Sequence, residues 1–215
     1  GKKPFVKIWM HIGLVTVNGK KMSKSAGNFM TIDDFLARHD PNTLRFLTLQ
    51  SHYRSPFDLD DKTIANAEAA LMRIEEFMAK LDLAARTIPK KGSGRSFDLD
   101  KYDAAFHEAM NDDVNTGAAI AALFSAINDI NDEIWNLSVS TLRSLRKWLE
   151  NTLLIFGIAI KPLKIPSKVK TLAKKRELFR IHKQFAPSDA LRQKIESLGY
   201  KIEDTPRGPL ILPLK

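Results

Sequence analysis

Cysteine is absent from this chain of 215 residues. Its absence excludes disulfide bonds, thiolate metal sites and cysteine nucleophiles, and it fits a reducing compartment. Long apolar runs are absent too: the longest, residues 153–160, is far shorter than the ~18–20 residues that span a bilayer. No secretory signal is expected at the start of the chain. With 44% hydrophobic and 27% charged residues, the chain can bury ordinary cores.

Acidic residues are missing from the first 32 positions, which carry six lysines. The formal charge is +6 over residues 1–32, −6 over 33–160 and +9 over 161–215, so two basic ends flank an acidic middle. This pattern favours two places where phosphate or nucleic acid can bind. The alternative is an ordinary solvated surface.

The first third of the chain predicts a hairpin, a loop and two helices. Val15 and Val17 alternate with polar neighbours before Asn18-Gly19, a favoured two-residue turn, so we expect a hairpin over residues 14–21 and a loop over 22–29. Thr31 is the expected N-cap of a helix that reaches His39 and ends at Pro41. Asn42 is the expected cap of the next helix.

The middle of the chain is strongly helical in pattern. Apolar residues at three- and four-residue spacing predict helices over 61–85, 99–110, about 116–134 and 142–153, with Trp135 and Trp148 in their core. Residues 89–96 are rich in Gly, Ser and basic residues and predict a linker. Four amphipathic helices of this length predict an antiparallel bundle.

The basic end predicts a separate small module. We expect helices over 168–184 and 187–198, joined at Pro187, and then strands over 200–202 and 210–212 around a turn at 205–208. The predicted fold is therefore mainly α, an antiparallel helical bundle followed by a small basic α+β module.

Chemistry is concentrated in Lys21-Met22-Ser23-Lys24-Ser25, hereafter the lysine loop, which follows the hairpin and precedes a helix. Two ammonium groups three residues apart can fold over phosphates, and Ser23 and Ser25 can hydrogen-bond phosphate or the loop backbone. Gly27 allows close backbone approach. Phosphoryl and nucleotidyl transfer require mainly positioning and stabilisation of negative charge, which lysine supplies. The alternative is a solvated loop without function.

The lysine loop resembles the signature loop of class I aminoacyl-tRNA synthetases. Its surroundings are similar to cysteinyl-tRNA synthetases in particular, over Trp9-Met10-His11, residues 15–19, residues 21–29, residues 49–58 and, in the tail, Phe185-Ala186, Asp189, Leu191-Arg192, Leu198-Gly199, residues 203–206 and Gly208. The resemblance covers essentially the whole chain.

The resemblance implies a fold and an activity. Residues 1–58 would end a class I catalytic domain and form the stem-contact fold, residues 59–160 would be the anticodon-binding bundle, and residues 161–215 would contact the anticodon. Members activate cysteine with ATP, with Mg²⁺ expected, and transfer it to the tRNA for cysteine. A cytoplasmic monomer with no membrane partner is implied.

Site residues follow from the same resemblance. Lys24 would bind ATP and Lys21 would hold the triphosphate as charge develops, both acting in catalysis, while Ser23, Ser25 and Gly27 would complete the ATP site.

The chain also departs from the family pattern. His11-Ile12-Gly13 is followed by Leu14, and it lies just before the lysine loop, whereas the family's His-Ile-Gly-His signature lies far upstream; we interpret the triplet as coincidence. The family's zinc ligands have no counterpart, so no metal site is predicted here. The resemblance therefore implies the C-terminal portion of a synthetase, inactive alone. Pro209-Leu210-Ile211 stands where the family has a terminal Trp.

Several polar residues are candidates for contact with tRNA. Two interpretations are open for His52 and Arg54. Either they contact tRNA or act at a hinge, or they cap the helix that precedes them. One predicted helix carries five basic residues, which either contact phosphate or form a solvated face; they are Lys174, Lys175, Arg176, Arg180 and Lys183. The family-like tail adds Arg192 and Asp204.

The remaining polar groups favour structural roles. His39, His107 and His182 are isolated and fit surface or packed positions better than ligand positions. Asp112-Asp113 fits a turn between helices better than a metal loop.

Two rivals to the ligase stay open. One is a non-catalytic tRNA-binding fragment, since half of the active site is missing from this sequence. The other is a family paralogue that ligates cysteine to an amino sugar, against which the long bundle and the basic tail argue, because a small-molecule ligase needs no anticodon reader.

Overall fold

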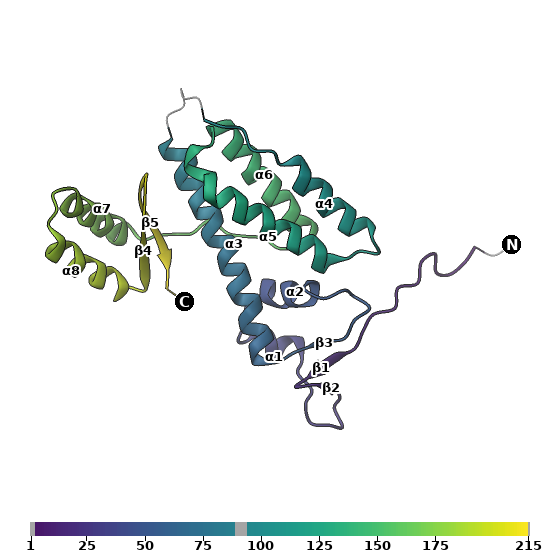
Figure 1. Cartoon of the computed structure of the whole chain (residues 1–215). Coiled ribbons are helices and arrows are strands. Elements are labelled where there is room, and N and C mark those ends of the chain that lie inside the picture. The colour runs from purple at the N-terminus through teal and green to yellow at the C-terminus, as the bar shows by residue number, and fades with distance from the viewer. Residues whose placement is uncertain (1–2, 89–93, 215) are drawn as a thin grey trace. The chain divides into compact units, whose positions relative to one another are not determined.

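The computed structural model describes residues 3–88 and 94–214, and most of their regular structure is helical (Figure 1). They divide into two compact units. Unit 1 comprises Gly1–Met72, Asp98–Asn128 and Leu149–Ala159, and unit 2 comprises Arg73–Phe97, Asp129–Trp148 and Ile160–Lys215. The mainly α fold is thus confirmed. Most of the predicted linker over 89–96 lies outside the described residues.

Unit 1 begins with a small mixed sheet. Strands β1 (Val15–Val17) and β2 (Lys20–Lys21) form the predicted antiparallel hairpin, and Asn18 and Gly19 have φ of 51° and 73°, as a turn of this type requires. Strand β3 (Phe57–Asp58) pairs with β1 in parallel, in the order β2-β1-β3. A two-residue strand carries too little pattern to be predicted from sequence.

Two short helices follow the loop. α1 (Ile32–Leu36) begins after Thr31, the predicted N-cap, whose hydroxyl accepts from the backbone N–H of Asp34 in a capping box, and it ends before His39, where its end was predicted. α2 (Pro41–Leu49) corrects two expectations, since its N-cap is Asp40 rather than Asn42 and Pro41 begins the helix instead of ending one. Proline fits at N1 because its missing N–H has no partner there anyway.

The helical core of unit 1 is built by α4 (Asp100–Asn111) and by parts of α3 (Asp61–Thr87), α5 (Thr116–Glu133) and α6 (Val139–Ile155). The ring of Phe46 in α2 meets Phe124 of α5 edge-on, and Phe106 of α4 meets Phe156 just after α6. Many residues of the predicted apolar stripes are buried in this unit, among them Ile64, Leu71, Phe106, Leu123 and Leu153, and Phe46, which no stripe predicted, is buried as well.

The helical part of unit 2 continues the same helices and adds a 3₁₀ turn, η1 (Ile134–Asn136). Asp82 of α3 pairs with Arg146 of α6, and Lys80 donates to the side chain of Asn131 in α5 at 2.6 Å. Trp135 and Trp148 are half-buried rather than core residues. No helix within the described ranges is both long and apolar enough to cross a membrane.

The C-terminal module in unit 2 contains α7 (Ser167–Ile181), α8 (Phe185–Glu196) and a hairpin of β4 (Tyr200–Thr205) and β5 (Gly208–Pro213). The two helices are separated at Lys183, which has a φ of 57°, and not at Pro187, which lies in the first turn of α8. Gly199 ends the helical part with a φ of 82°. The small core consists of Val169, Ala173, Ile195 and Ile202.

We predict that Ile195→Ala destabilises this module by roughly 2–4 kcal/mol, because the side chain is fully buried and its loss leaves a cavity. Hydrogen exchange over residues 167–214 measures the effect. Leu178→Ala is the matched control: its side chain is 58% exposed, so its cost should stay near 0.5 kcal/mol. Equal losses of protection in both variants would contradict the assignment of this core.

Candidate functional site

The lysine loop leaves the hairpin directly from β2. The backbone N–H of Met22 donates to the Val15 carbonyl at 3.1 Å, which extends the hairpin by one bond. Asn28 then closes the loop: its side-chain oxygen accepts from the Ser23 N–H at 2.9 Å, and its amide nitrogen donates to the Lys21 carbonyl at 3.2 Å. Asn28 was not singled out from sequence, although an Asn beside Gly at a loop end is a familiar turn signal.

The interior of the loop is a tight turn over residues 24–27. The Gly27 N–H donates to the Lys24 carbonyl at 3.2 Å, and the hydroxyls of Ser23 and Ser25 lie 3.3 Å apart. Gly27 has a φ of 68° and open space where a Cβ would be, so the backbone conformation favours glycine here, and the close approach of a ligand to it stays a prediction. The two serines and Lys24 are thus brought together in one turn.

Lys21 and Lys24 are both exposed, and neither forms an ion pair with any residue in the described ranges. The Lys24 ammonium lies 5.4 Å from the centroid of the Phe29 ring, a weak attraction at an exposed site. Both charges are therefore accessible to an anion from solution.

The His11-Ile12-Gly13 triplet has a structural explanation in its glycine. The Gly13 N–H donates to the Tyr53 carbonyl at 2.7 Å, and a Cβ at this position would lie 2.1 Å from the Ser55 carbonyl oxygen. Gly13 therefore allows two backbone segments to approach, and it does not open a helix as the family's nucleotide signature does.

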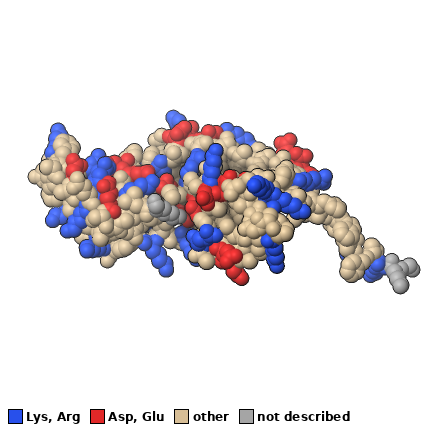
Figure 2. Space-filling view, turned by 90° about the horizontal axis from the view of Figure 1, so that it is seen from below, with Lys and Arg blue, Asp and Glu red and all other residues tan. Residues whose placement is uncertain are grey.

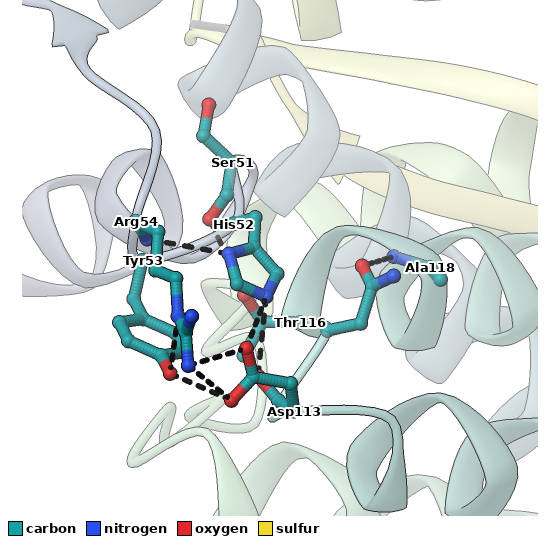
Figure 3. Close-up of polar contacts among 8 residues, drawn as sticks. Ser51, His52, Tyr53, Arg54, Asp113, Thr116 and Ala118 are labelled. Atoms are coloured by element: carbon teal, nitrogen blue, oxygen red, sulfur yellow. Dashed lines mark hydrogen bonds and ion pairs between the residues drawn. The ribbon is translucent and has the colours of Figure 1, made fainter. Parts of the chain in front are cut away.

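His52 and Arg54 meet at Asp113, in the turn between α4 and α5 (Figure 3). The Arg54 guanidinium lies 3.0 Å from the Asp113 carboxylate, the Tyr53 hydroxyl donates to it at 2.7 Å, and His52 Nε2 lies 3.1 Å from the Asp113 carbonyl oxygen. The hydrogen bond from Tyr53, with the charge of Arg54, holds the pKa of Asp113 below its ordinary value.

The cluster does not support helix capping, one of the two interpretations that the sequence left open, because His52 and Arg54 connect residues 52–54 to the α4–α5 turn. The other interpretation, a tRNA or hinge role, stays a prediction. Asp113 and Val114 have φ of 52° and 56°, so residues 112–114 form the predicted turn, and the described residues hold no group of three possible metal ligands. Arg54 is still 64% exposed, which leaves it within reach of a partner.

Three arginines of the C-terminal module converge on Asp204. Arg176 makes two hydrogen bonds to its carboxylate, at 2.6 and 3.1 Å, while Arg180 lies 2.6 Å and Arg192 3.5 Å from it. Arg176 is 2% exposed, and its Nε has no hydrogen-bond partner among the described residues. The bonds from Arg176, with the charges of all three arginines, lower the pKa of Asp204.

The predicted basic face therefore divides into two kinds of residue. Arg176 is a buried partner of Asp204, whereas Arg180 and Arg192 are partly exposed and Lys174, Lys175 and Lys183 are exposed. On the face shown in Figure 2, basic side chains lie at several places around the C-terminal module instead of forming one continuous patch.

The isolated histidines each have a local partner. His39 lies 2.9 Å from Glu68, His107 lies 3.7 Å from Asp103 one turn away, and the ring of His182 is 2.8 Å from the Leu178 carbonyl. These contacts agree with the structural roles that the sequence favoured.

Comparison with known proteins decides the family. Residues 1–69 match the family model described as the tRNA synthetases class I (C) catalytic domain, and residues 105–161 match the DALR domain. The chain is 34% identical to a cysteine–tRNA ligase of Caldicellulosiruptor saccharolyticus, over 99% of this chain and 47% of that protein. It is 37% identical to cysteine–tRNA ligases of Oenococcus oeni and Nitratidesulfovibrio vulgaris, over 96% of this chain in each and 45% and 48% of those proteins.

The chain belongs to the cysteinyl-tRNA synthetase family. The predicted resemblance is thus confirmed, and the order of the two models along the chain is consistent with the C-terminal portion of such a synthetase. The chain spans about half the length of the curated relatives it matches. The lysine loop and residues 52–58 lie inside the match to the catalytic domain, and Asp113 lies inside the match to the DALR domain.

We predict that acid weakens the C-terminal module through Asp204. The folded-state pKa of Asp204 is lowered, so the unfolded chain binds the proton more readily, and the stability that the carboxylate contributes above about pH 4 is lost as the pH falls through the folded pKa. Asp204→Asn should cost roughly 3 kcal/mol at pH 7, because Arg176 would stay buried without its partner. The stability of this variant should then depend less on pH in the acid range.

Hydrogen exchange of residues 167–214, referenced to intrinsic rates between pH 3 and 7, measures both effects. Arg192→Gln is the control, since it removes a more distant and more exposed partner and should cost under about 1 kcal/mol. An unchanged acid dependence in Asp204→Asn would exclude this carboxylate as the group responsible.

Proposed function

We propose that this chain is the C-terminal portion of a cysteine–tRNA ligase, in which the full enzyme activates cysteine with ATP and transfers it to the tRNA for cysteine. One observation carries the proposal: in a member of this family, the lysine loop presents two exposed ammonium groups that form no ion pair in the described ranges. Catalysis of nucleotidyl transfer requires such uncompensated positive charge near the phosphates.

The loop geometry supports a division of roles. Lys24 lies in the turn with Ser23 and Ser25, so its ammonium group would bind the triphosphate while the two hydroxyls donate to phosphate oxygens. Lys21, at the end of β2, would neutralise charge on the leaving pyrophosphate. ATP is expected to arrive with Mg²⁺, which would supply further charge neutralisation when bound.

Contact with tRNA is proposed for the helical bundle and the C-terminal module. The module exposes three lysines of the predicted set and partly exposes Arg180 and Arg192, beside which Asp204 lies as a hydrogen-bond acceptor; the lysines are Lys174, Lys175 and Lys183. Arg176, buried against Asp204, would position that carboxylate and not touch RNA itself. Arg54 and His52 would contact tRNA while they stay bonded to Asp113.

The rest of the active site is expected outside these 215 residues. The His-Ile-Gly-His signature and the zinc ligands that the family resemblance implies have no counterpart in this sequence, so we propose that the chain alone does not aminoacylate. A separate tRNA-binding function is the second candidate, because the exposed cations of the module do not depend on the lysine loop. The long bundle and the basic tail argue against the amino-sugar paralogue, because a small-molecule ligase needs no anticodon reader.

We predict that Lys24→Ala, made in the full-length synthetase carrying this sequence, slows adenylate formation by about 10²–10³-fold, because one positioned donor to the reacting phosphates is removed. Pyrophosphate exchange measures the rate. Lys20→Ala is the matched control, since it removes the same charge from an exposed position of β2, just before the loop, and should have little effect. An unchanged rate for Lys24→Ala would refute the assignment of the loop.

We predict that replacing Arg180 and Arg192 with Gln in the chain weakens tRNA binding and lowers the slope of log K against log salt by roughly one for each phosphate that is no longer bound. Filter binding over a series of salt concentrations would measure it. The control is Lys194→Gln, which removes one positive charge from an exposed position of α8 outside the predicted set and is compared with each arginine replaced singly. Equal slopes in the parent chain and the double variant would exclude these arginines as phosphate ligands.

A further inference from the structure

Asp58 makes a set of contacts with the hairpin that no local sequence pattern predicts. Its carboxylate accepts a hydrogen bond from the Thr16 hydroxyl at 2.8 Å, and the backbone N–H of Gly19 lies 3.1 and 2.9 Å from its two oxygens. About forty residues separate it from both partners. The side chain therefore reaches from β3 across β1 to the turn of the hairpin.

The turn that Asp58 holds determines where the lysine loop begins. Asn18 and Gly19 are both in left-handed conformations, and only two residues of β2 separate Gly19 from Met22. Because the Gly19 N–H is bound to a carboxylate, the turn has a fixed orientation, and with it the direction in which β2 delivers Lys21. A charged acceptor makes such bonds stronger than neutral ones.

Hydrogen bonds on both sides hold β3 in place. The Phe57 N–H donates to the Leu14 carbonyl at 3.1 Å and the Leu59 N–H to the Thr16 carbonyl at 2.8 Å, so residues 57–59 follow β1. The Thr63 hydroxyl donates to the Asp58 carbonyl at 2.8 Å, which joins the strand to the first turn of α3. Asp58 thus connects the hairpin to the start of α3.

We propose that Asp58 is a positioning residue for the lysine loop: by binding the hairpin turn, it sets the place from which Lys21 and Lys24 reach the phosphates. The role in catalysis rests on the proposed function of the loop, whereas the effect on the hairpin does not. An acid fits this place best because the Gly19 N–H lies within hydrogen-bond distance of both oxygens, whereas an amide would present one acceptor oxygen together with an NH₂ group.

Hydrogen exchange on the 215-residue chain tests the effect on the hairpin. Asp58→Ala should speed exchange of the Gly19 and Met22 amides by roughly tenfold, because the turn loses its acceptor and opens more often. Asp58→Asn, which keeps one acceptor, should give an intermediate rate. Unchanged exchange at Gly19 and Met22 in both variants would overturn the proposal.

Asp60→Ala is the matched control. The Asp60 carboxylate accepts from the Thr63 N–H at 2.7 Å at the start of α3 and makes none of the hairpin contacts of Asp58. The substitution should speed exchange at Thr63 and Ile64 while leaving Gly19 and Met22 unchanged. If Asp60→Ala loosens the hairpin as much as Asp58→Ala does, the effect of Asp58 is general destabilisation and the proposal fails.

Kinetics of the full-length synthetase test the catalytic role. Asp58→Ala should lower kcat for adenylate formation by about tenfold or more with a much smaller change in KM for ATP, because the lost positioning acts in the transition state, and Asp58→Asn should recover part of it. If exchange rises but Asp58→Ala and Lys24→Ala both leave kcat unchanged, the function proposed for the loop fails and the structural clamp stands. If Lys24→Ala alone lowers kcat, the positioning role of Asp58 is refuted.

Discussion

The parallel contact between residues 13–16 and residues 53–58 is the interaction on which the candidate site depends. The first segment leads into the hairpin and the lysine loop, and the second leads into α3 and carries both Arg54 and Asp58. Backbone bonds from Gly13, Phe57 and Leu59 hold the two segments in register. Such short strands are marginal alone, so the carboxylate of Asp58 supplies side-chain bonds that a longer sheet would not need.

Asp113 extends this connection within unit 1. Residues 53–59 bind the hairpin through their backbone. In the same part of the chain, the side chains of His52, Tyr53 and Arg54 bind the α4–α5 turn (Figure 3). The Thr116 hydroxyl adds a long bond to the Ser51 carbonyl at 3.5 Å. A short run of sequence thus contacts the hairpin that precedes the lysine loop on one side and the turn between α4 and α5 on the other, and each contact includes an acid whose partner is distant in sequence.

Local signals in the sequence predicted much of the fold. Asn18-Gly19 predicted a hairpin because few other dipeptides accept two positive φ angles. Thr31 predicted a helix start because threonine is a favoured N-cap and the two acids after it suit the first turn of a helix. The apolar periodicity that predicted α3 to α6 reflects burial on one helix face. Pro41 was misread because proline begins a helix as readily as it ends one, and only Asp40 beside it distinguishes the two.

The candidate site was less predictable, because its partners are far apart in sequence. Nothing in the residues around Asp113 indicates that a tyrosine and an arginine about sixty positions earlier will bind it, and Asp58 has the same property. The basic face of α7 shows the opposite error. Helical spacing grouped Arg176 with exposed cations, yet burial against Asp204 makes it part of the module's core.

The net charge therefore has a different meaning at each of the two basic ends of the chain. In the C-terminal module, three of the fourteen basic residues share one carboxylate, so the net charge overstates what RNA can meet. Near the N-terminus, the absence of acids over the first 32 residues leaves Lys21 and Lys24 without a local partner. Asp58 reaches this region from β3 and binds a backbone N–H and a hydroxyl of the hairpin, and under our proposal it orders the loop while leaving both ammonium groups unneutralised. A phosphate-binding loop needs this combination, since order lowers the entropic cost of binding and free charge supplies the attraction.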